Sequence, residues 1–219
     1  MSNAPAVCRM DDMRQHRKYV GFTLIEMLVV IAIIGLLAAM IAGVAIGVKE
    51  KQKTKRVDAE KTKLLAAIES YHSKYGYFPY DNGMLTKAYD PDRNYAITNQ
   101  LCYELTGPTY DANNIQYTCF DGSVVKSNEY FTAFNRADIA NSIEPRPFLS
   151  PPPKSIDYKS NFVANAPNVN FLIVPVDLNG NTLNPWRYDA SSTNRHNTDS
   201  FDLWAVFTVG NKTVTNGNW

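Results

Sequence analysis

Apolar and polar residues are arranged in three different ways along the chain, beginning with an apolar run near the N-terminus. Residues 27–48 contain no charged side chain and no proline. At roughly 1.5 Å per residue, a helix of this length crosses a hydrocarbon core of about 30 Å. We therefore expect residues 22–48 to form a transmembrane helical stem.

The next segment, residues 49–76, has the residue spacing of an amphipathic helix. Its apolar positions are Val57, Leu64, Leu65, Ile68 and Tyr71, and its polar positions are Lys55, Arg56, Asp58, Lys61 and Lys63. Gly76 and the nearby Pro79 are typical of a helix end. This segment is expected to continue the same helix outside the membrane and to place its apolar stripe against a globular head.

The rest of the chain lacks long helical periods and is expected to form that head. Residues 77–168 read as a turn-rich variable region with a short helix over 129–143. Residues 169–219 are expected to form an antiparallel β region, with strand patterns over 169–176, 182–188, 201–209 and 214–219 and a hairpin signal at Asn179-Gly180. The predicted fold class is α+β: a long N-terminal helix packed on a small antiparallel β-sheet head.

A single carboxylate lies at the start of the apolar segment. On insertion scales a charged side chain costs about 2.5–3.5 kcal/mol at the centre of a membrane helix and less near an end, so Glu26 needs a functional reason. It lies four residues after Phe22, and a basic leader ending in Gly21 precedes it. This arrangement resembles the processing and methylation signal of type IV pilins and of type II secretion pseudopilins. The alternative is an ordinary signal anchor with an isolated acid.

The resemblance implies specific roles for the residues of the motif. Residues 1–21 would be a prepilin leader, and a prepilin peptidase would cleave between Gly21 and Phe22 and methylate the new amine of Phe22. Glu26 would neutralise that amine on an adjacent subunit during assembly. Met13 is a second candidate for the first residue, because residues 13–21 form a compact basic leader without acids.

Two further segments, residues 71–80 and 184–219, resemble the major pseudopilins of the type II secretion system. The resemblance implies a structural subunit that assembles into a pseudopilus for type II protein secretion. The implied partners are the prepilin peptidase, identical or related pilin-like subunits in a homo-polymer, and an assembly platform in the inner membrane. The alternative is a type IV pilus subunit whose head acts as an adhesion or DNA-uptake binding module.

The resemblance also implies a location. The chain would pass once through the inner membrane, with its N-terminus cytoplasmic and its head periplasmic, and would become part of a periplasmic filament after assembly. Lysine and arginine counts on the two sides of the apolar run do not decide the orientation.

Small residues recur every four positions in the apolar run, at Gly35, Ala39, Gly43 and Gly47. Residues with this spacing share one helix face, and small side chains let membrane helices approach closely. The stripe is either a packing surface between stems or a consequence of the frequency of glycine and alanine in membrane helices.

The charge distribution argues against a nucleic-acid partner. The formal net charge is +1 for the whole chain. The leader contributes +2, so that the processed chain is slightly acidic. Binding to nucleic acid requires a clustered basic excess, and the head carries an acidic one.

The residues expected to carry chemistry are few. Cys102 and Cys119 would be the only cysteines after processing, and in an oxidising compartment they form either a disulfide or two buried thiols. The segment 210–216 stands where major pseudopilins bind calcium, but it contains Lys212 and no carboxylate. The segment 177–181 lacks the spacing and distal glutamate of a calcium loop. We expect no catalytic residue, no cofactor and no metal site, and hence no enzyme.

Overall fold

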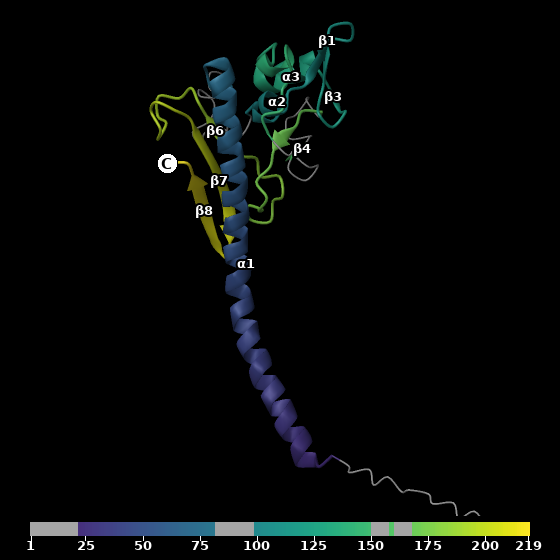
Figure 1. The fold of residues 1–219 in the computed structure, drawn as a ribbon, viewed down its shortest axis with the longest axis vertical. Helices are drawn as coiled ribbons and strands as arrows, with labels where there is room; N and C mark the ends of the chain where they lie inside the picture. The colour runs from purple at the N-terminus through teal and green to yellow at the C-terminus, as the bar shows by residue number, and fades with distance from the viewer. Residues whose placement is uncertain (1–21, 82–98, 150–157, 160–167) are drawn as a thin grey trace, which may run out of the picture. The chain divides into compact units, whose positions relative to one another are not determined.

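The computed structural model describes residues 22–81, 99–149, 158–159 and 168–219, with side chains at all of these positions except 41–47 and 158–159. The predicted leader therefore lies outside the described residues. The chain divides into two compact units, residues 1–46 and 47–219. One helix, α1 (Leu24–Tyr75), contributes to both (Figure 1).

The described part of the first unit is helical. The side chains of α1 up to Met40 are exposed, including Leu28, Ile31 and Leu36. Among the residues that the structure describes, no helix is long and apolar enough to cross a membrane. The transmembrane stem over residues 22–48 stays a prediction.

The second unit combines the later part of α1 with short helices and three antiparallel sheets. The helices are α2 (Leu101–Thr106), α3 (Ser127–Phe134) and a 3-10 helix (Ala140–Ser142). The strands are β1 (Thr109–Asp111), β2 (Gln116–Thr118), β3 (Val124–Lys126), β4 (Tyr158–Lys159), β5 (Phe171–Leu172), β6 (Arg187–Asp189), β7 (Asp202–Val209) and β8 (Lys212–Gly217). They pair in the orders β1-β2-β3, β4-β5 and β6-β7-β8. The predicted α+β class is confirmed.

The core of the second unit gathers the apolar side chains of α1 and of the strands. Val57, Leu64, Ile68 and Tyr71 of α1 are fully buried, as their helical spacing predicts, and Leu65 packs against them at the edge. On β7, Leu203, Ala205 and Phe207 occupy alternate positions and point into the main core, because successive side chains of a strand point to opposite faces. Trp204 is also buried, but it belongs to a separate small cluster with Val206. Apart from these two, the residues belong to one continuous hydrophobic cluster.

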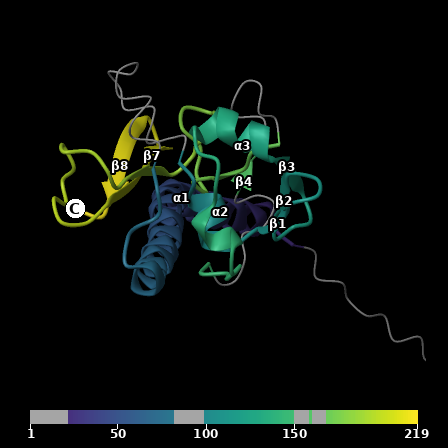
Figure 2. The ribbon, with the colours of Figure 1, turned by 90° about the horizontal axis from the view of Figure 1, so that it is seen from above.

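Within the second unit, two groups of elements can be distinguished (Figures 1 and 2). The sheet β6-β7-β8 forms one group, and α2, α3 and β1-β2-β3 gather in another. The second group belongs to the region for which the sequence predicted only turns and a short helix. Its strands are three residues long, too short for an alternating pattern to stand out.

Several elements are shorter than the sequence pattern predicted, for local reasons. The helix expected over 129–143 is α3, which ends at Phe134 because Asn135 adopts a left-handed conformation with φ of 49°. The strand expected over 182–188 is reduced to β6, and the preceding Pro185 forms an isolated antiparallel bridge with Ile173. The segment 210–216 is not a loop, because β8 begins at Lys212 directly after a tight turn at Gly210. The hairpin signal at Asn179-Gly180 is a turn with positive φ at both residues.

Candidate functional site

The first candidate site is the N-terminal turn of α1, where the sequence placed Phe22 and Glu26. The carbonyl of Thr23 accepts the first helical bond, from the Met27 amide at 3.3 Å, so Thr23 is the N-cap residue. Glu26 stands three positions after the cap. Thr23 and Glu26 therefore occupy the two positions of a capping box, in which each side chain accepts a bond from the backbone amide of the other residue.

The hydrogen bonds of this turn are reciprocal. Oε2 of Glu26 accepts bonds from the Thr23 backbone N–H at 2.9 Å and from the Thr23 hydroxyl at 2.7 Å. The Glu26 amide in turn donates to the Thr23 hydroxyl oxygen at 3.3 Å. The carboxylate is thus held at the positive end of the helix, where a negative charge is favourable.

The remaining residues of the predicted N-terminal site lie next to this turn or outside the described residues. Phe22 directly precedes the cap and is 70% exposed. Gly21 lies outside the described residues. The structure therefore places Phe22 and Glu26 at the same end of α1.

Of the predicted packing stripe, Gly35 and Ala39 lie on exposed helix. A Cβ atom added at Gly35 would meet no atom within 4 Å, so this surface is open. The side chains at Gly43 and Gly47 lie outside those the structure describes. Packing between stems stays a prediction.

The two cysteines are both buried and both free thiols in this structure. Cys102 lies in α2, and Cys119 follows β2 in a turn where its amide donates to the Ser123 carbonyl at 2.8 Å. Burial raises the pKa of Cys102 well above its usual value and raises the pKa of Cys119 to about 11. Burial thus disfavours the thiolate, which is the reactive form of cysteine. The predicted disulfide is not formed here and stays a prediction.

A second polar site, which the sequence analysis missed, lies deep in the second unit around Glu104. This glutamate of α2 is fully buried. Its carboxylate accepts bonds from the Tyr71 hydroxyl at 3.1 Å, from the Ala140 amide at 3.0 Å and from the Asn141 amide at 3.1 Å. Burial raises the pKa of Glu104, and the three donors oppose that shift. The site joins α1, α2 and the 3-10 helix.

Asn141 extends this site to a second tyrosine of α1. Its side-chain amide donates to the Glu104 carbonyl at 2.8 Å and to the Arg146 carbonyl at 2.7 Å. Its side-chain oxygen accepts bonds from the Tyr75 hydroxyl at 3.1 Å and from the Arg146 amide at 3.0 Å. Tyr71 and Tyr75, one turn apart on α1, therefore both donate into a buried Glu104–Asn141 pair.

The loop between β6 and β7, residues 190–201, is held by another missed residue, Arg195. Its guanidinium donates to four backbone carbonyls of the same loop, those of Ala190, Ser192, Asn197 and Thr198, at 2.8 to 3.4 Å. The buried carboxylate of Asp202 accepts the amides of His196 and Asn197 at 2.7 and 3.0 Å. The carbonyls of the loop are thus held by Arg195 from within it, whereas its amides are held mostly by carboxylates outside it, those of Asp81, Asp189 and Asp202.

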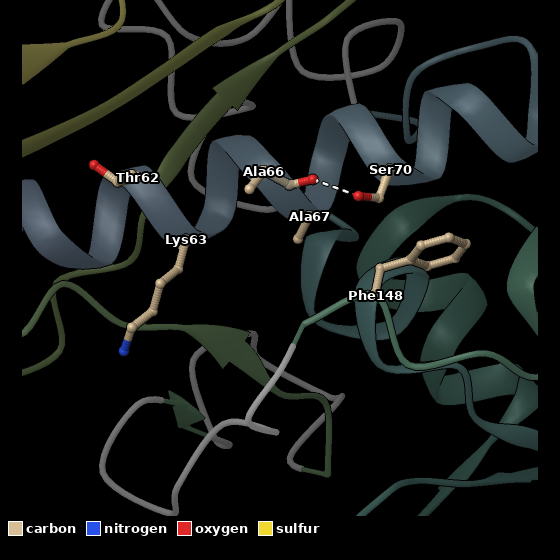
Figure 3. Close-up of a pocket in the computed structure, with 6 residues that line it drawn as sticks. All are labelled: Thr62, Lys63, Ala66, Ala67, Ser70 and Phe148. Carbon is tan, nitrogen blue, oxygen red and sulfur yellow. Dashed lines mark hydrogen bonds between the residues drawn. The ribbon is translucent and has the colours of Figure 1, made fainter.

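The groove beside α1 shown in Figure 3 offers no catalytic arrangement. It encloses about 320 Å³ and is lined by Thr62, Lys63, Ala66, Ala67, Ser70 and Phe148. The Ser70 hydroxyl donates to the Ala66 carbonyl at 2.8 Å, and the lining contains neither a histidine nor a carboxylate that could act as a base. Within the described parts of the chain, no group of three or more His, Cys, Asp or Glu side chains is arranged to hold a metal ion.

Comparison with known proteins identifies the class of the N-terminal segment. Residues 17–42 match the prokaryotic N-terminal methylation motif. This range includes Gly21, Phe22 and Glu26 and most of the apolar run, up to residue 42. The resemblance predicted from those residues is confirmed by the match.

A particular relative extends the similarity beyond the motif. The chain is 34% identical over 88 residues to the type II secretion system core protein G of Vibrio cholerae, a match that covers 38% of this chain and 60% of the relative. The chain thus spans less than two thirds of that relative's length. No solved structure matches the chain. The two matches support the pseudopilin family and do not favour the alternative of a type IV pilus subunit with a binding head.

Proposed function

We propose that this chain is a pilin-like structural subunit of a pseudopilus for type II protein secretion. The observation that carries the proposal is the N-terminal turn of α1. Phe22 stands exposed directly before the helix cap, and the Glu26 carboxylate is fixed one turn later. The match of residues 17–42 to a methylation motif and the similarity to a type II secretion core protein support it.

In this proposal each residue of the turn has one role. A prepilin peptidase cleaves between Gly21 and Phe22 and methylates the Phe22 amine. Glu26 then neutralises the amine of an adjacent subunit, because opposite charges attract strongly where water is excluded. The leader is cytoplasmic, residues 22–48 anchor the chain in the inner membrane, and the head is periplasmic before and after assembly on an inner-membrane platform.

Two further sets of residues serve the subunit in this proposal. Gly35, Ala39, Gly43 and Gly47 let neighbouring stems approach closely.

Cys102 and Cys119 form a disulfide once a periplasmic thiol oxidant is present, which would add about 3 kcal/mol of stability in the chain-entropy model. The disulfide is tested on protein whose head has reached the periplasmic side. Its intact mass is measured before and after reduction. If both cysteines can be alkylated in denaturant without prior reduction, the disulfide is contradicted.

Cleavage is tested by mass spectrometry of the N-terminal peptide from membrane-fraction protein. We expect a chain that begins at N-methylated Phe22, and we expect Gly21→Ile to keep its leader because the bulky side chain blocks the peptidase. Gly35→Ala is the matched control, since its added methyl group meets no atom within 4 Å. An intact leader on the wild-type chain in cells that contain the peptidase would contradict the proposal.

Assembly is tested by pelleting filaments from cells that produce the full chain. Glu26→Ala should insert and lose its leader normally but yield no filament, because the neighbouring amine keeps an uncompensated charge. Glu69→Ala, which removes an exposed carboxylate from the same helix, should assemble as the wild type does. Normal filaments from Glu26→Ala would rule out the role given to Glu26.

A further inference from the structure

Three side chains able to react with one another meet between α1 and β8, outside the sites described above. Lys61 and Asp58 lie one turn apart on α1, and Asn216 lies on β8, 155 residues after Lys61. Nζ of Lys61 donates to the side-chain oxygen of Asn216 and to the Gly217 carbonyl, the latter at 2.8 Å. Two acceptors on β8 therefore hold the lysine nitrogen against the side-chain amide of Asn216.

Asp58 contacts both members of this pair. Its Oδ1 accepts a bond from Nδ2 of Asn216 at 2.8 Å and lies 3.8 Å from Nζ of Lys61. The Lys61 side chain is only 17% exposed. An amine, an amide and a carboxylate that can move protons between them are thus held together, and such fixed proximity replaces an encounter in solution.

We propose that Lys61 and Asn216 form an isopeptide bond, with Asp58 as the residue that transfers the protons. The bond would join Nζ of Lys61 to Cγ of Asn216. This inference goes beyond the proposed function and does not depend on it.

The reaction is an acyl transfer from ammonia to lysine. Asp58 first takes a proton from the Lys61 ammonium, because only the neutral amine is a nucleophile. Nζ then adds to Cγ of Asn216. As the bond between Cγ and Nδ2 breaks, Asp58 gives its proton to Nδ2 and takes a second proton from Nζ. The released ammonia accepts that proton, which leaves an ammonium ion and an ionised Asp58. No oxidant or reductant is consumed.

The bond would tie the edge of a sheet to the long helix. In the described sheet β6-β7-β8, the strand β8 is at the edge and pairs with β7 alone. A covalent link at Asn216 would keep this edge strand attached to α1 when the head is pulled or unfolded.

The test is the intact mass of the full chain, purified in detergent micelles and then reduced and denatured. We expect it to fall one ammonia below the mass calculated from the sequence and the N-terminus found. Lys61 should also resist trypsin, so that residues 57–63 appear joined to the peptide that begins at Thr213. A mass equal to the calculated one would overturn the inference, whether or not the leader has been removed.

Three variants locate the reacting groups. Lys61→Arg should retain the ammonia because the nucleophile is gone, and Asp58→Ala should retain it because the proton carrier is gone. Lys63→Arg, two residues along the same helix, is the matched control and should lose ammonia as the wild type does.

The variants also separate the isopeptide bond from another loss of ammonia. The backbone amide of Gly217 could attack Cγ of Asn216 and form a succinimide, a reaction that does not involve Lys61. Loss of ammonia from Lys61→Arg would therefore overturn the isopeptide bond. Loss from Asp58→Ala at the wild-type level would overturn the role of Asp58.

Discussion

Two glutamates show how differently the two units of the chain satisfy a carboxylate. Glu26 is exposed, and its bonds come from Thr23, three residues away. Glu104 is fully buried, and its bonds come from Tyr71, Ala140 and Asn141, which are 33 to 37 residues away in the sequence. The first carboxylate is held by one helical turn, and the second only by the complete fold of the head.

The difference determines what each carboxylate can do. Glu26 keeps one oxygen free of described partners, which suits a contact with another molecule. Glu104 has both oxygens occupied by three donors from two other elements, α1 and the 3-10 helix, which suits a contact that fixes the head internally. A carboxylate that is locally held and exposed is accessible to another molecule, whereas one that is buried and fully bonded is structural.

The largest effect is expected from Glu104→Ala. The substitution leaves the Tyr71 hydroxyl and the amides of Ala140 and Asn141 without an acceptor in the core and opens a cavity. Each such loss costs about 1–3 kcal/mol, so we expect the free energy of unfolding to fall by about 3–5 kcal/mol. Urea unfolding of the full chain in detergent micelles, followed by the fluorescence of buried tryptophans such as Trp186, measures it.

Glu69→Ala is the matched control, because Glu69 is exposed on the same unit. It should change the free energy of unfolding by no more than about 0.5 kcal/mol. If Glu104→Ala unfolds at the same urea concentration as the wild type, Glu104 does not stabilise the head. The contrast between the two glutamates would then be wrong.

The two sites also differ in how far the sequence predicts them. The Thr23–Glu26 pair lies at the spacing of a capping box, and the motif of Gly21, Phe22 and Glu26 spans six residues, so both are contained in one short window. The buried stripe of α1 was predicted for the same reason, since helical periodicity is local. The α+β class followed from this helix and from the strand pattern of 201–209.

The Glu104 site could not be predicted in this way. Glu104 sits in a six-residue helix with no periodic signal, and Asn141 lies in a 3-10 helix of only three residues. Tyr71 was predicted only as an apolar position, although its hydroxyl carries the contact. What joins these residues is the path of the chain through the variable region, and no spacing in the sequence encodes it.

Arg195 provides an intermediate case, in which the contacts are local but lie within the head. Its guanidinium holds four carbonyls, none more than five residues away. Arg195→Ala should therefore destabilise the loop 190–201 more than the head as a whole. We expect a loss of about 1–2 kcal/mol in global stability and faster amide hydrogen exchange confined to this loop.

The control is Arg195→Lys, which keeps the charge but not the planar fork of donors, and it should show a smaller change in the same amides. Faster exchange throughout the head after Arg195→Ala would show that this loop supports the whole fold, as Glu104 is expected to do.

The smallest effect is expected from Tyr71→Phe, which removes one of the three donors to Glu104 and keeps the ring in the core. We expect a loss of about 1 kcal/mol in the free energy of unfolding. Tyr75→Phe, at a less buried position one turn later, should lose less.

Tyr71→Phe also tests the ionisation of Glu104. Burial raises the pKa of Glu104 above its usual value of 4.5 in the folded chain, so the folded state binds this proton more tightly than the unfolded state does. The resulting stability is present below pH 4.5 and is lost as pH rises through the higher, folded pKa. The Tyr71 hydroxyl opposes this shift by donating to the carboxylate. Its removal should therefore steepen the loss of stability with rising pH, whereas Glu104→Gln, which cannot titrate, should flatten it. If the stability of both variants depends on pH as that of the wild type does, Glu104 does not change its charge in this range. Burial then does not control the ionisation of Glu104.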